Sequence, residues 1–321
     1  MSRKARLVFM GSPEFALPSL QAMATHHDVC AVFTQPPRRR GRGMKLEPTP
    51  IGAYAEQQGI TCFSPQRLTG PDHAELLASY QADMFIVVAY GQLLSPQILS
   101  IPRLGCVNGH ASLLPRWRGA APIQRAIQAG DKMTGITAMM MAKGLDTGPM
   151  LNKTEIEITP QMTASILHDR LAEMTATTLL DAAASLMAGT ATPEAQDEAQ
   201  ACYAAKISKE EAELSLADDA HSLSCHIRAF SPFPGAFIQT ISGRLKLLHA
   251  DIAEHASNAD KGQFMGCDPQ GRMLIGCGDG VLAISHVQLA GKKQMQATEF
   301  LNGQNWQAGQ QIILPTVQIE G

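Results

Sequence analysis

Residues 106–119 carry the side chains best suited to chemistry. Asn108 and His110 lie two residues apart in a segment that we expect to form a strand. Side chains at positions i and i+2 of a strand point to the same face, so both should project into one space. An amide and an imidazole can each donate a hydrogen bond to an oxygen that becomes negative when its carbonyl carbon is attacked. Asp146, in Lys-Gly-Leu-Asp-Thr-Gly-Pro, is the best candidate for a group that takes up protons. Alone, the short Asn-x-His pattern more often marks a strand end followed by a turn.

An alternation of apolar runs and helical periods surrounds these residues and predicts a doubly wound α/β, Rossmann-like domain. Strands are expected at residues 7–10, 29–34, 61–63, 84–89, 106–110 and 134–142, and an edge hairpin at 149–158. Helices are expected at residues 14–23, 50–58, 71–80, 122–129 and 163–187. In such sheets ligands bind at the carboxyl ends of the strands, where Asn108, His110 and the loop of Asp146 are predicted to lie. The full Gly-x-Gly-x-x-Gly pattern is absent, so no NAD site is expected.

The last third of the chain has a different pattern. Residues 190–207 are rich in Ala, Pro, Gln and Glu and have no apolar period, so we predict a linker there. One helix at 220–230 is followed by five short strands, which is typical of a small OB-like β-barrel. These strands are expected at residues 235–241, 244–252, 264–266, 273–277 and 281–289. The predicted organisation is therefore a catalytic domain at 1–189, a linker at 190–207 and an OB-like domain at 208–321.

Composition limits the classes of protein that remain. A chain of 321 residues favours two domains, and a net charge of −3 means that a nucleic acid must meet a local basic patch. The seven cysteines include no Cys-x-x-Cys pair, so we interpret them as reduced core thiols and expect no metal. Because no apolar run has the length of a membrane span, we expect a cytoplasmic protein, and we expect it to be a monomer.

The strongest charge feature is the basic loop at residues 37–45, Pro-Arg-Arg-Arg-Gly-Arg-Gly-Met-Lys. Most such runs are only solvated surface. This one follows the second predicted strand, so it should emerge at the same edge as Asn108 and His110. Arginines there can reach phosphates and stack on unpaired bases. The candidate nucleic-acid contacts are Arg38, Arg40, Arg42 and Lys45.

An ordered set of motifs across the chain closely resembles the folate-dependent formyltransferases, and within them those that act on methionyl-tRNA. Asn108-x-His110 is followed by Ser-Leu-Leu-Pro-Arg at 112–116 and by Arg-Gly-Ala-Ala-Pro-Ile at 118–123. Further matches are residues 11–15, 33–36, 88–91 and 144–148. Two residues depart from the family pattern, since Gly109 replaces a branched apolar residue and Ala111 replaces Pro or Gly.

The resemblance implies an activity and a role for each candidate residue. The activity is transfer of the formyl group of 10-formyltetrahydrofolate to the α-amine of initiator methionyl-tRNA, as used in translation initiation. Asn108 and His110 would stabilise the oxyanion, and Asp146 would orient His110 and relay the proton of the amine. The implied folate contacts are Ala89, Tyr90, Gly91, Ser112, Leu113, Leu114 and Pro115. The basic loop, with Arg42 foremost, would read the tRNA acceptor arm. The last domain would bind tRNA less specifically through basic residues such as Arg228, Arg244, Lys246, Lys292 and Lys293.

Four other interpretations remain open from the sequence. The formyl acceptor could be the amine of a sugar nucleotide or of glycinamide ribonucleotide, or water in a hydrolase. The chain could also be a noncatalytic RNA-binding protein that uses the basic loop and the OB-like domain. The basic loop and the barrel-like tail favour tRNA over the smaller acceptors.

Overall fold

The computed structural model describes residues 4–40, 44–253 and 259–313, and the side chain of Arg40 lies outside this description, as do the remaining residues. These residues form two compact units. The first contains the described residues of 1–122, 133–157 and 168–204, and the second contains those of 123–132, 158–167 and 205–321. The domain boundaries expected at residues 189 and 208 stay predictions.

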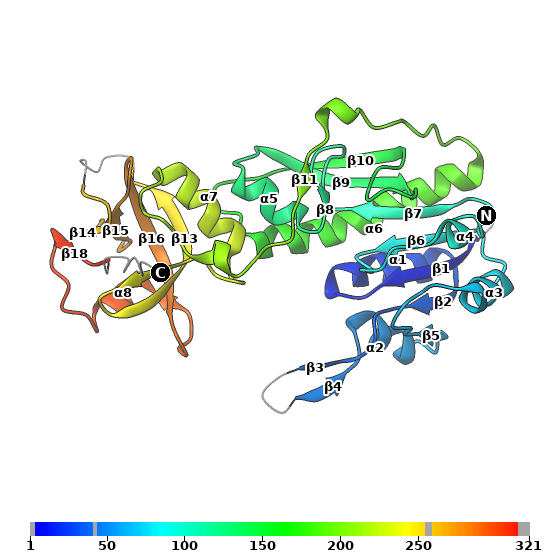
Figure 1. Cartoon of the computed structure of the whole chain (residues 1–321), viewed down its shortest axis with the longest axis horizontal. Helices are drawn as coiled ribbons and strands as arrows, with labels where there is room; N and C mark the ends of the chain where they lie inside the picture. Colours follow the sequence, from blue (N-terminus) through cyan, green and yellow to red (C-terminus); the bar gives the residue numbers. More distant parts are fainter. Residues whose placement is uncertain (1–3, 41–43, 254–258, 314–321) are drawn as a thin grey trace, which may run out of the picture. The chain divides into compact units, whose positions relative to one another are not determined.

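The first unit is built on a seven-stranded sheet in the order β10-β9-β7-β6-β1-β2-β5 (Figure 1). The strands are β1 (Arg6–Gly11), β2 (Asp28–Phe33), β5 (Cys62–Phe63), β6 (Met84–Val88), β7 (Cys106–His110), β9 (Met133–Met140) and β10 (Met150–Glu157). The strands from β7 to β5 run parallel. β9 runs antiparallel to β7, and β10 runs antiparallel to β9.

Helices cover both faces of this sheet, which confirms the predicted doubly wound α/β fold. They are α1 (Leu17–His26), α2 (Pro50–Gln57), α3 (Pro71–Ser79), α4 (Pro96–Leu99) and α6 (Ala164–Ala188). Apart from its first residue, α5 (Pro122–Gln128) belongs to the second unit. Local signals place some of their ends. The Thr49 hydroxyl, for example, accepts a hydrogen bond of 3.0 Å from the Gly52 amide, as its position before Pro50 predicts.

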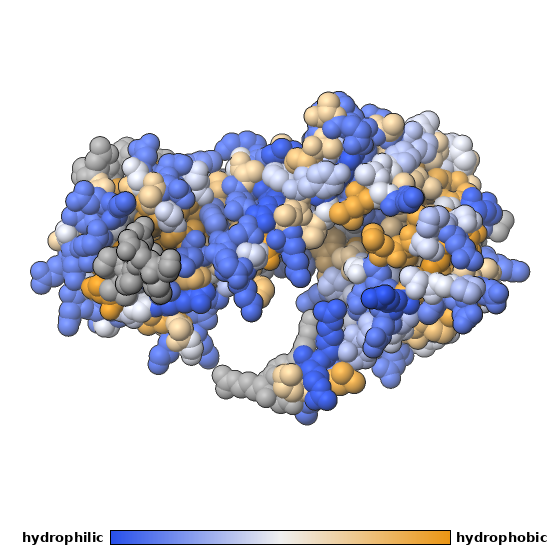
Figure 2. All heavy atoms as spheres, viewed as in Figure 1, coloured by the Kyte–Doolittle hydropathy of each residue, from blue (hydrophilic) through white to orange (hydrophobic). Residues whose placement is uncertain are grey.

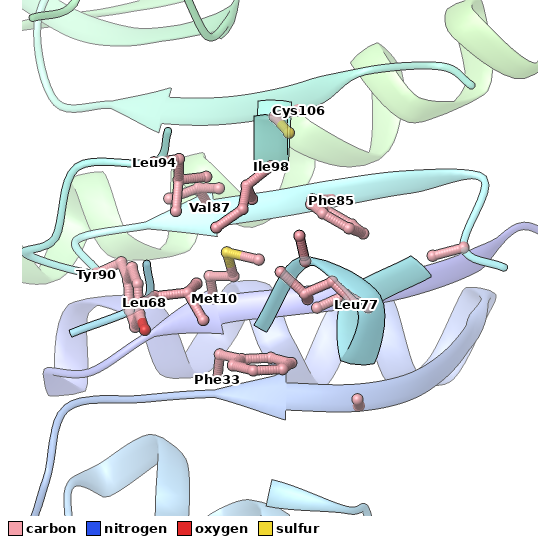
Figure 3. Close-up of a cluster of buried hydrophobic side chains, with 14 residues drawn as sticks. Met10, Phe33, Leu68, Leu77, Phe85, Val87, Tyr90, Leu94, Ile98 and Cys106 are labelled. Atoms are coloured by element: carbon pink, nitrogen blue, oxygen red, sulfur yellow. The ribbon is translucent and has the colours of Figure 1, made fainter. Parts of the chain in front are cut away.

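The alternation of side chains along β7 explains how the sheet presents Asn108 and His110. Cys106 belongs to the buried cluster that includes Val87 of β6, Leu77 of α3 and Ile98 of α4 (Figure 3). Because Asn108 and His110 follow Cys106 at intervals of two, they continue along this same face beyond the apolar core. Burial raises the pKa of the Cys106 thiol to about 12, so this cysteine stays protonated and belongs to the core.

The opposite face of β7 lies against α6, and Gly109 is the point of close approach. A Cβ atom added at Gly109 would lie 2.6 Å from Thr175 Cγ2 and 3.1 Å from Leu179 Cδ1. Both neighbours belong to α6, and neither is exposed. Side chains of the helix therefore fill the space above the glycine.

The second unit contains an antiparallel sheet in the order β12-β13-β16-β15-β14-β18, with β17 paired to β16. Its strands are β12 (Phe237–Thr240), β13 (Gly243–Ile252), β14 (Gln263–Cys267), β15 (Met273–Gly276), β16 (Val281–Leu289), β17 (Met295–Gln296) and β18 (Gln310–Gln311). The helix α7 (Ala220–Phe230) packs on this sheet, where Ser224 donates a hydrogen bond of 2.6 Å to the Ala250 carbonyl. The curled antiparallel sheet confirms the predicted OB-like class.

Several short elements were missed because they carry no apolar period. Backbone pairing turns the predicted basic loop into a hairpin of β3 (Arg38–Arg40) and β4 (Lys45–Glu47). The predicted helix at 14–23 begins as a 3-10 turn, η1 (Glu14–Ala16). Other short elements are β8 (Arg118–Gly119), β11 (Tyr203–Ala204), α8 (Ala297–Leu301) and the 3-10 helices η2 (Glu198–Gln200) and η3 (Glu210–Ala212).

The close packing of β7 against α6 can be tested by substitutions at Gly109 and Thr175. Gly109→Ala places a methyl group against Thr175 Cγ2, and such overpacking typically costs about 1–3 kcal/mol of unfolding free energy. Adding Thr175→Ser removes Cγ2 but keeps the hydroxyl that donates to Leu171 O at 2.6 Å, so it should restore part of the loss. Calorimetry of both variants checks this, with Gly303→Ala as control because its added Cβ would meet only ordinary contacts. A Gly109→Ala protein as stable as the wild type would contradict the packing argument.

Candidate active site

The structure brings His110 and Asp146 together as the sequence predicts. His110 Nδ1 lies 3.6 Å from Asp146 Oδ2, and the two side chains are 7% and 14% exposed. Asn108 is half-buried two residues before His110, and no hydrogen bond to its side-chain amide is found within the described part of the chain. An imidazole, a carboxylate and an available amide therefore belong to one small region of the unit.

The second ring nitrogen of His110 is held by a group that the sequence did not reveal. Nε2 lies 2.9 Å from the carbonyl oxygen of Trp117. Because a carbonyl can only accept, Nε2 must carry the hydrogen, and the imidazole turns Nδ1 toward Asp146. Trp117 has a left-handed backbone, with φ of 62°, which a sequence pattern does not predict for tryptophan.

Asp146 reaches His110 by a route that differs from the predicted one. The sequence places the Asp146 loop at the same sheet edge as His110, as though all strands were parallel. Because β9 is antiparallel, its last residue, Met140, pairs with Val107 near the start of β7. The loop at residues 141–149 must therefore return along β7 to bring the carboxylate to His110.

Backbone groups fix the returning loop. The Gly119 amide donates a hydrogen bond of 2.9 Å to Asp146 Oδ2, the same oxygen that faces His110. The other carboxylate oxygen, Oδ1, receives no hydrogen bond from any residue that the structure describes. Asp146 itself has a φ of 54°, a left-handed conformation that is uncommon for residues other than glycine.

The segment predicted as a linker takes part in this arrangement. Gln196 donates hydrogen bonds to the carbonyl oxygens of Asp146 and Gly148 at 2.8 and 2.7 Å. The Arg118 side chain, which is fully buried, bonds both Gln196 and Glu198. Hydrogen bonding to Arg118 holds the pKa of Glu198 below its usual range. Composition alone gave no signal for these contacts.

The residues implied to contact folate divide into interior and accessible groups. Ser112 and Leu114 are fully buried, and the Ser112 hydroxyl donates to Arg116 O at 2.6 Å. Ala89, Gly91, Leu113 and Pro115 are exposed or half-buried. A ligand could touch the second group directly, whereas the first group shapes the wall from behind.

Tyr90 lies in the core rather than at the surface. Its ring is 2% exposed and lies beside Leu68 and Met10 (Figure 3). Its hydroxyl has no hydrogen-bond partner among the described residues, and burial raises its pKa above the usual range. Its contribution to a ligand site would therefore come through its backbone and its packing.

Apolar surface is available near these residues for a flat ligand. Leu93 follows β6 and is 74% exposed, and Leu145 precedes Asp146 and is 50% exposed. Hydrophobic residues gather over the region of β6 on the face shown in Figure 2. A pterin ring needs such apolar contact together with a few polar groups, so these residues fit a folate.

The β3–β4 hairpin carries the basic residues away from the sheet (Figure 1). Arg38 pairs with Glu47 across the hairpin, and the exposed residues of the hairpin include Arg38 and Lys45. At its base, Gln35 donates a hydrogen bond of 3.1 Å to the Tyr90 carbonyl, which links the hairpin to the loop after β6. Arg42, the foremost predicted contact, lies outside the described residues.

Two further sequence interpretations need correction in the structure. Arg228 is 8% exposed and donates to Met162 O and Cys225 Sγ, so it is not a surface residue that could meet RNA. The interpretation of all cysteines as core thiols is wrong for Cys62 and Cys267, which are exposed. Among the described residues, no three His, Cys, Asp or Glu side chains cluster as metal ligands do. Nor does this part of the chain contain a helix long and apolar enough to cross a bilayer.

Two family profiles together match most of the chain. The profile of the formyl transferase family matches residues 5–183, and that of the formyl transferase C-terminal domain matches residues 206–305. The fold is also similar to HypX from Aquifex aeolicus, solved in complex with tetrahydrofolic acid. The TM-score is 0.62 at 16% identity, over 94% of this chain and 47% of that one. The chain belongs to the formyl transferase family.

Similarity is greater to particular members of that family. The methionyl-tRNA formyltransferase of Methylococcus capsulatus is 46% identical over 92% of this chain and 96% of its own length. The methionyl-tRNA formyltransferase of Parvibaculum lavamentivorans is 44% identical over 96% of this chain and 99% of its own.

Proposed function

We propose that this protein transfers the formyl group of 10-formyltetrahydrofolate to the α-amine of methionyl-tRNA. Its similarity to two methionyl-tRNA formyltransferases over almost the whole chain supports this activity. The observation that carries the choice of site is the 3.6 Å contact of His110 with Asp146 beside the available Asn108 amide.

The two oxygens of Asp146 suit it to a role in proton transfer. Oδ2 is held by the Gly119 amide and faces His110, whereas Oδ1 has no bonded partner in the described chain. In the proposed reaction the neutral amine attacks the formyl carbon and the carbonyl becomes an oxyanion. Oδ1 takes the proton that the amine loses, directly or through water. The oxyanion then re-forms the carbonyl, the bond from the formyl carbon to the nitrogen of tetrahydrofolate breaks, and that nitrogen accepts the proton held by Asp146.

Asn108 and His110 are proposed to stabilise the oxyanion. The Asn108 amide has hydrogens to donate, and a single donor of this kind is typically worth about 3 kcal/mol of barrier. The Nε2 hydrogen of His110 is bonded to Trp117 O. His110 can donate to the formyl oxygen only if its Nε2–H exchanges the hydrogen bond to Trp117 O for one to the substrate. Asp146 lies on the opposite side of the ring and fixes the orientation of the imidazole for this donation.

The hairpin of β3 and β4 is the proposed contact for the tRNA acceptor arm. It begins after β2, whose carboxyl end lies at the same sheet edge as that of β7 because the intervening strands are parallel. Arg38 and Lys45 are exposed there. In the second unit, Arg244 and Lys246 line a recess with residues 288–291. This recess is the proposed site of weaker phosphate contacts.

Action on methionyl-tRNA implies a cytoplasmic location, and we propose a monomer as the active form. Formyl transfer to a sugar nucleotide, to glycinamide ribonucleotide or to water remains the alternative outcome for the same site. The basic hairpin supports an RNA acceptor over these smaller ones, because several exposed cations on one projecting element suit a polyanion.

The reaction can be tested with formyl donor and either charged initiator tRNA or a UDP-amino sugar. Asp146→Asn should lower kcat for methionyl-tRNA by about 10²–10⁴-fold, since it removes the proton acceptor. Asn108→Ala should cost about 10²–10³-fold. Thermal stability and folate affinity should stay close to wild type, as should all properties of the control Asp181→Asn on the exposed side of α6. Normal turnover by Asp146→Asn would refute the assignment.

A separate experiment tests the hairpin. Arg38→Ala should raise KM for methionyl-tRNA and reduce the slope of log(kcat/KM) against log[salt] by about one, as the loss of one phosphate contact predicts. KM for the formyl donor should not change. Arg170→Ala removes an equal charge from the exposed surface of α6 and serves as control. If both variants keep the wild-type salt slope, the hairpin does not contact the tRNA.

A further inference from the structure

The residues that follow α6 include one whose contacts set it apart from its neighbours. From Thr192 to Gln200 every residue is exposed except Gln196, which is half-buried. Its neighbours on either side, Ala195 and Asp197, face solvent. Nothing in the composition of this stretch marks Gln196 for a role, so its significance rests on the contacts of its side chain.

Both hydrogens of the Gln196 amide are used on the turn that carries Asp146. Nε2 donates to Asp146 O at 2.8 Å and to Gly148 O at 2.7 Å. These two carbonyls flank Thr147, so one side chain fixes the turn on both sides of it. Because both partners can only accept, the nitrogen of the amide must be the atom that faces them.

Arg118 fixes the other half of the same amide. Its Nε donates to Gln196 Oε1 at 2.9 Å, and a guanidinium can only donate. The contacts of Nε2 and of Oε1 are thus both consistent with the same orientation of the Gln196 amide. The remaining nitrogens of Arg118 bond both oxygens of Glu198 at 2.9 and 2.8 Å, and Arg118 is fully buried. Such a planar, bidentate pair holds the guanidinium in one place.

The Gly119 amide completes the arrangement. This residue follows Arg118 in β8, and it donates at 2.9 Å to Asp146 Oδ2. Gln196 therefore holds the backbone of Asp146 while the chain next to Arg118 holds its carboxylate. The left-handed backbone of Asp146, with φ of 54°, needs such support, because residues other than glycine rarely adopt it.

We propose that Gln196 is a positioning residue for Asp146, which it holds at the distance from His110 that formyl transfer requires. The inference rests on the proposed function, in which Asp146 is the proton acceptor. A misplacement of a reacting group by about 1 Å can cost about 10²-fold in rate. Gln196 acts entirely through the Asp146 turn, so its loss should lower kcat and leave KM for both substrates unchanged.

Two variants of Gln196 separate positioning from folding. Gln196→Ala removes all three contacts. Gln196→Glu keeps an oxygen for Arg118 but turns a second oxygen toward two carbonyls, which repel it. If Gln196 only stabilises the fold, the variant with the lower melting temperature should also have the lower kcat. If Gln196 positions Asp146, the kcat of Gln196→Glu should be no higher than that of Gln196→Ala. This should hold even though the ion pair of the new glutamate with Arg118 supports the fold. The matched control is Gln200→Ala, because Gln200 lies on the same segment and bonds only Asp197.

The experiment measures kcat, KM, melting temperature and hydrogen exchange of the Gly119 amide in these variants and in Asp146→Asn. We expect kcat to fall about 10–100-fold in both Gln196 variants, with unchanged KM. We also expect faster exchange of the Gly119 amide, whose bond to Asp146 would be weakened, and no change in Gln200→Ala. An inactive Asp146→Asn beside Gln196 variants of normal kcat would overturn this inference alone. Wild-type turnover by Asp146→Asn would instead overturn the proposed function, and the positioning role with it.

Discussion

The contact between His110 and Asp146 is the constraint on which the arrangement of the first unit depends. His110 is the last residue of β7, which runs parallel to β6. Asp146 lies in the loop after β9, and this loop starts near the beginning of β7 because β9 runs antiparallel to it. The loop has to return along the sheet, and a returning loop has no ladder of its own to hold it. Its fixation comes from β8 and from the segment after α6, through Gly119 and Gln196. Residues remote in sequence therefore determine where the carboxylate lies.

The alternation of side chains along β7 positions the other two proposed site residues, Asn108 and His110. The face of β7 that packs Cys106 into the apolar cluster continues into Asn108 and His110, so the core and the site share one surface. On the opposite face Gly109 allows α6 to approach closely, and Thr175 and Leu179 occupy the space of a larger side chain. The strand that carries the polar groups is thus packed from behind, and the glycine does not leave a cavity there.

Much of this could be predicted from patterns of period and motif. Long apolar runs and helical periods gave the α/β order and the strands after residue 235, because burial of one face imposes those periods on the sequence. The contact between His110 and Asp146 was expected from residue type and resemblance, and a catalytic role for Asn108, His110 and Asp146 stays a proposal. Three features left no such trace. The direction of β9 is set by sheet pairing, the carbonyl of Trp117 belongs to the backbone, and Gln196 sits in a stretch whose composition reads as a linker. A local sequence pattern does not predict hydrogen bonds between distant segments, because neither partner alone carries a distinctive sequence signal.

A crystal structure of the protein with a stable 10-formyl folate analogue would test the central claim most directly. The measured quantities are the distances from the formyl oxygen to Asn108 Nδ2 and from the formyl carbon to Asp146 Oδ1. The account predicts a hydrogen bond of about 3 Å to Asn108, with Asp146 still against His110 and room for an amine between Oδ1 and the formyl carbon. A formyl group bound out of reach of both Asn108 and Asp146 would contradict it.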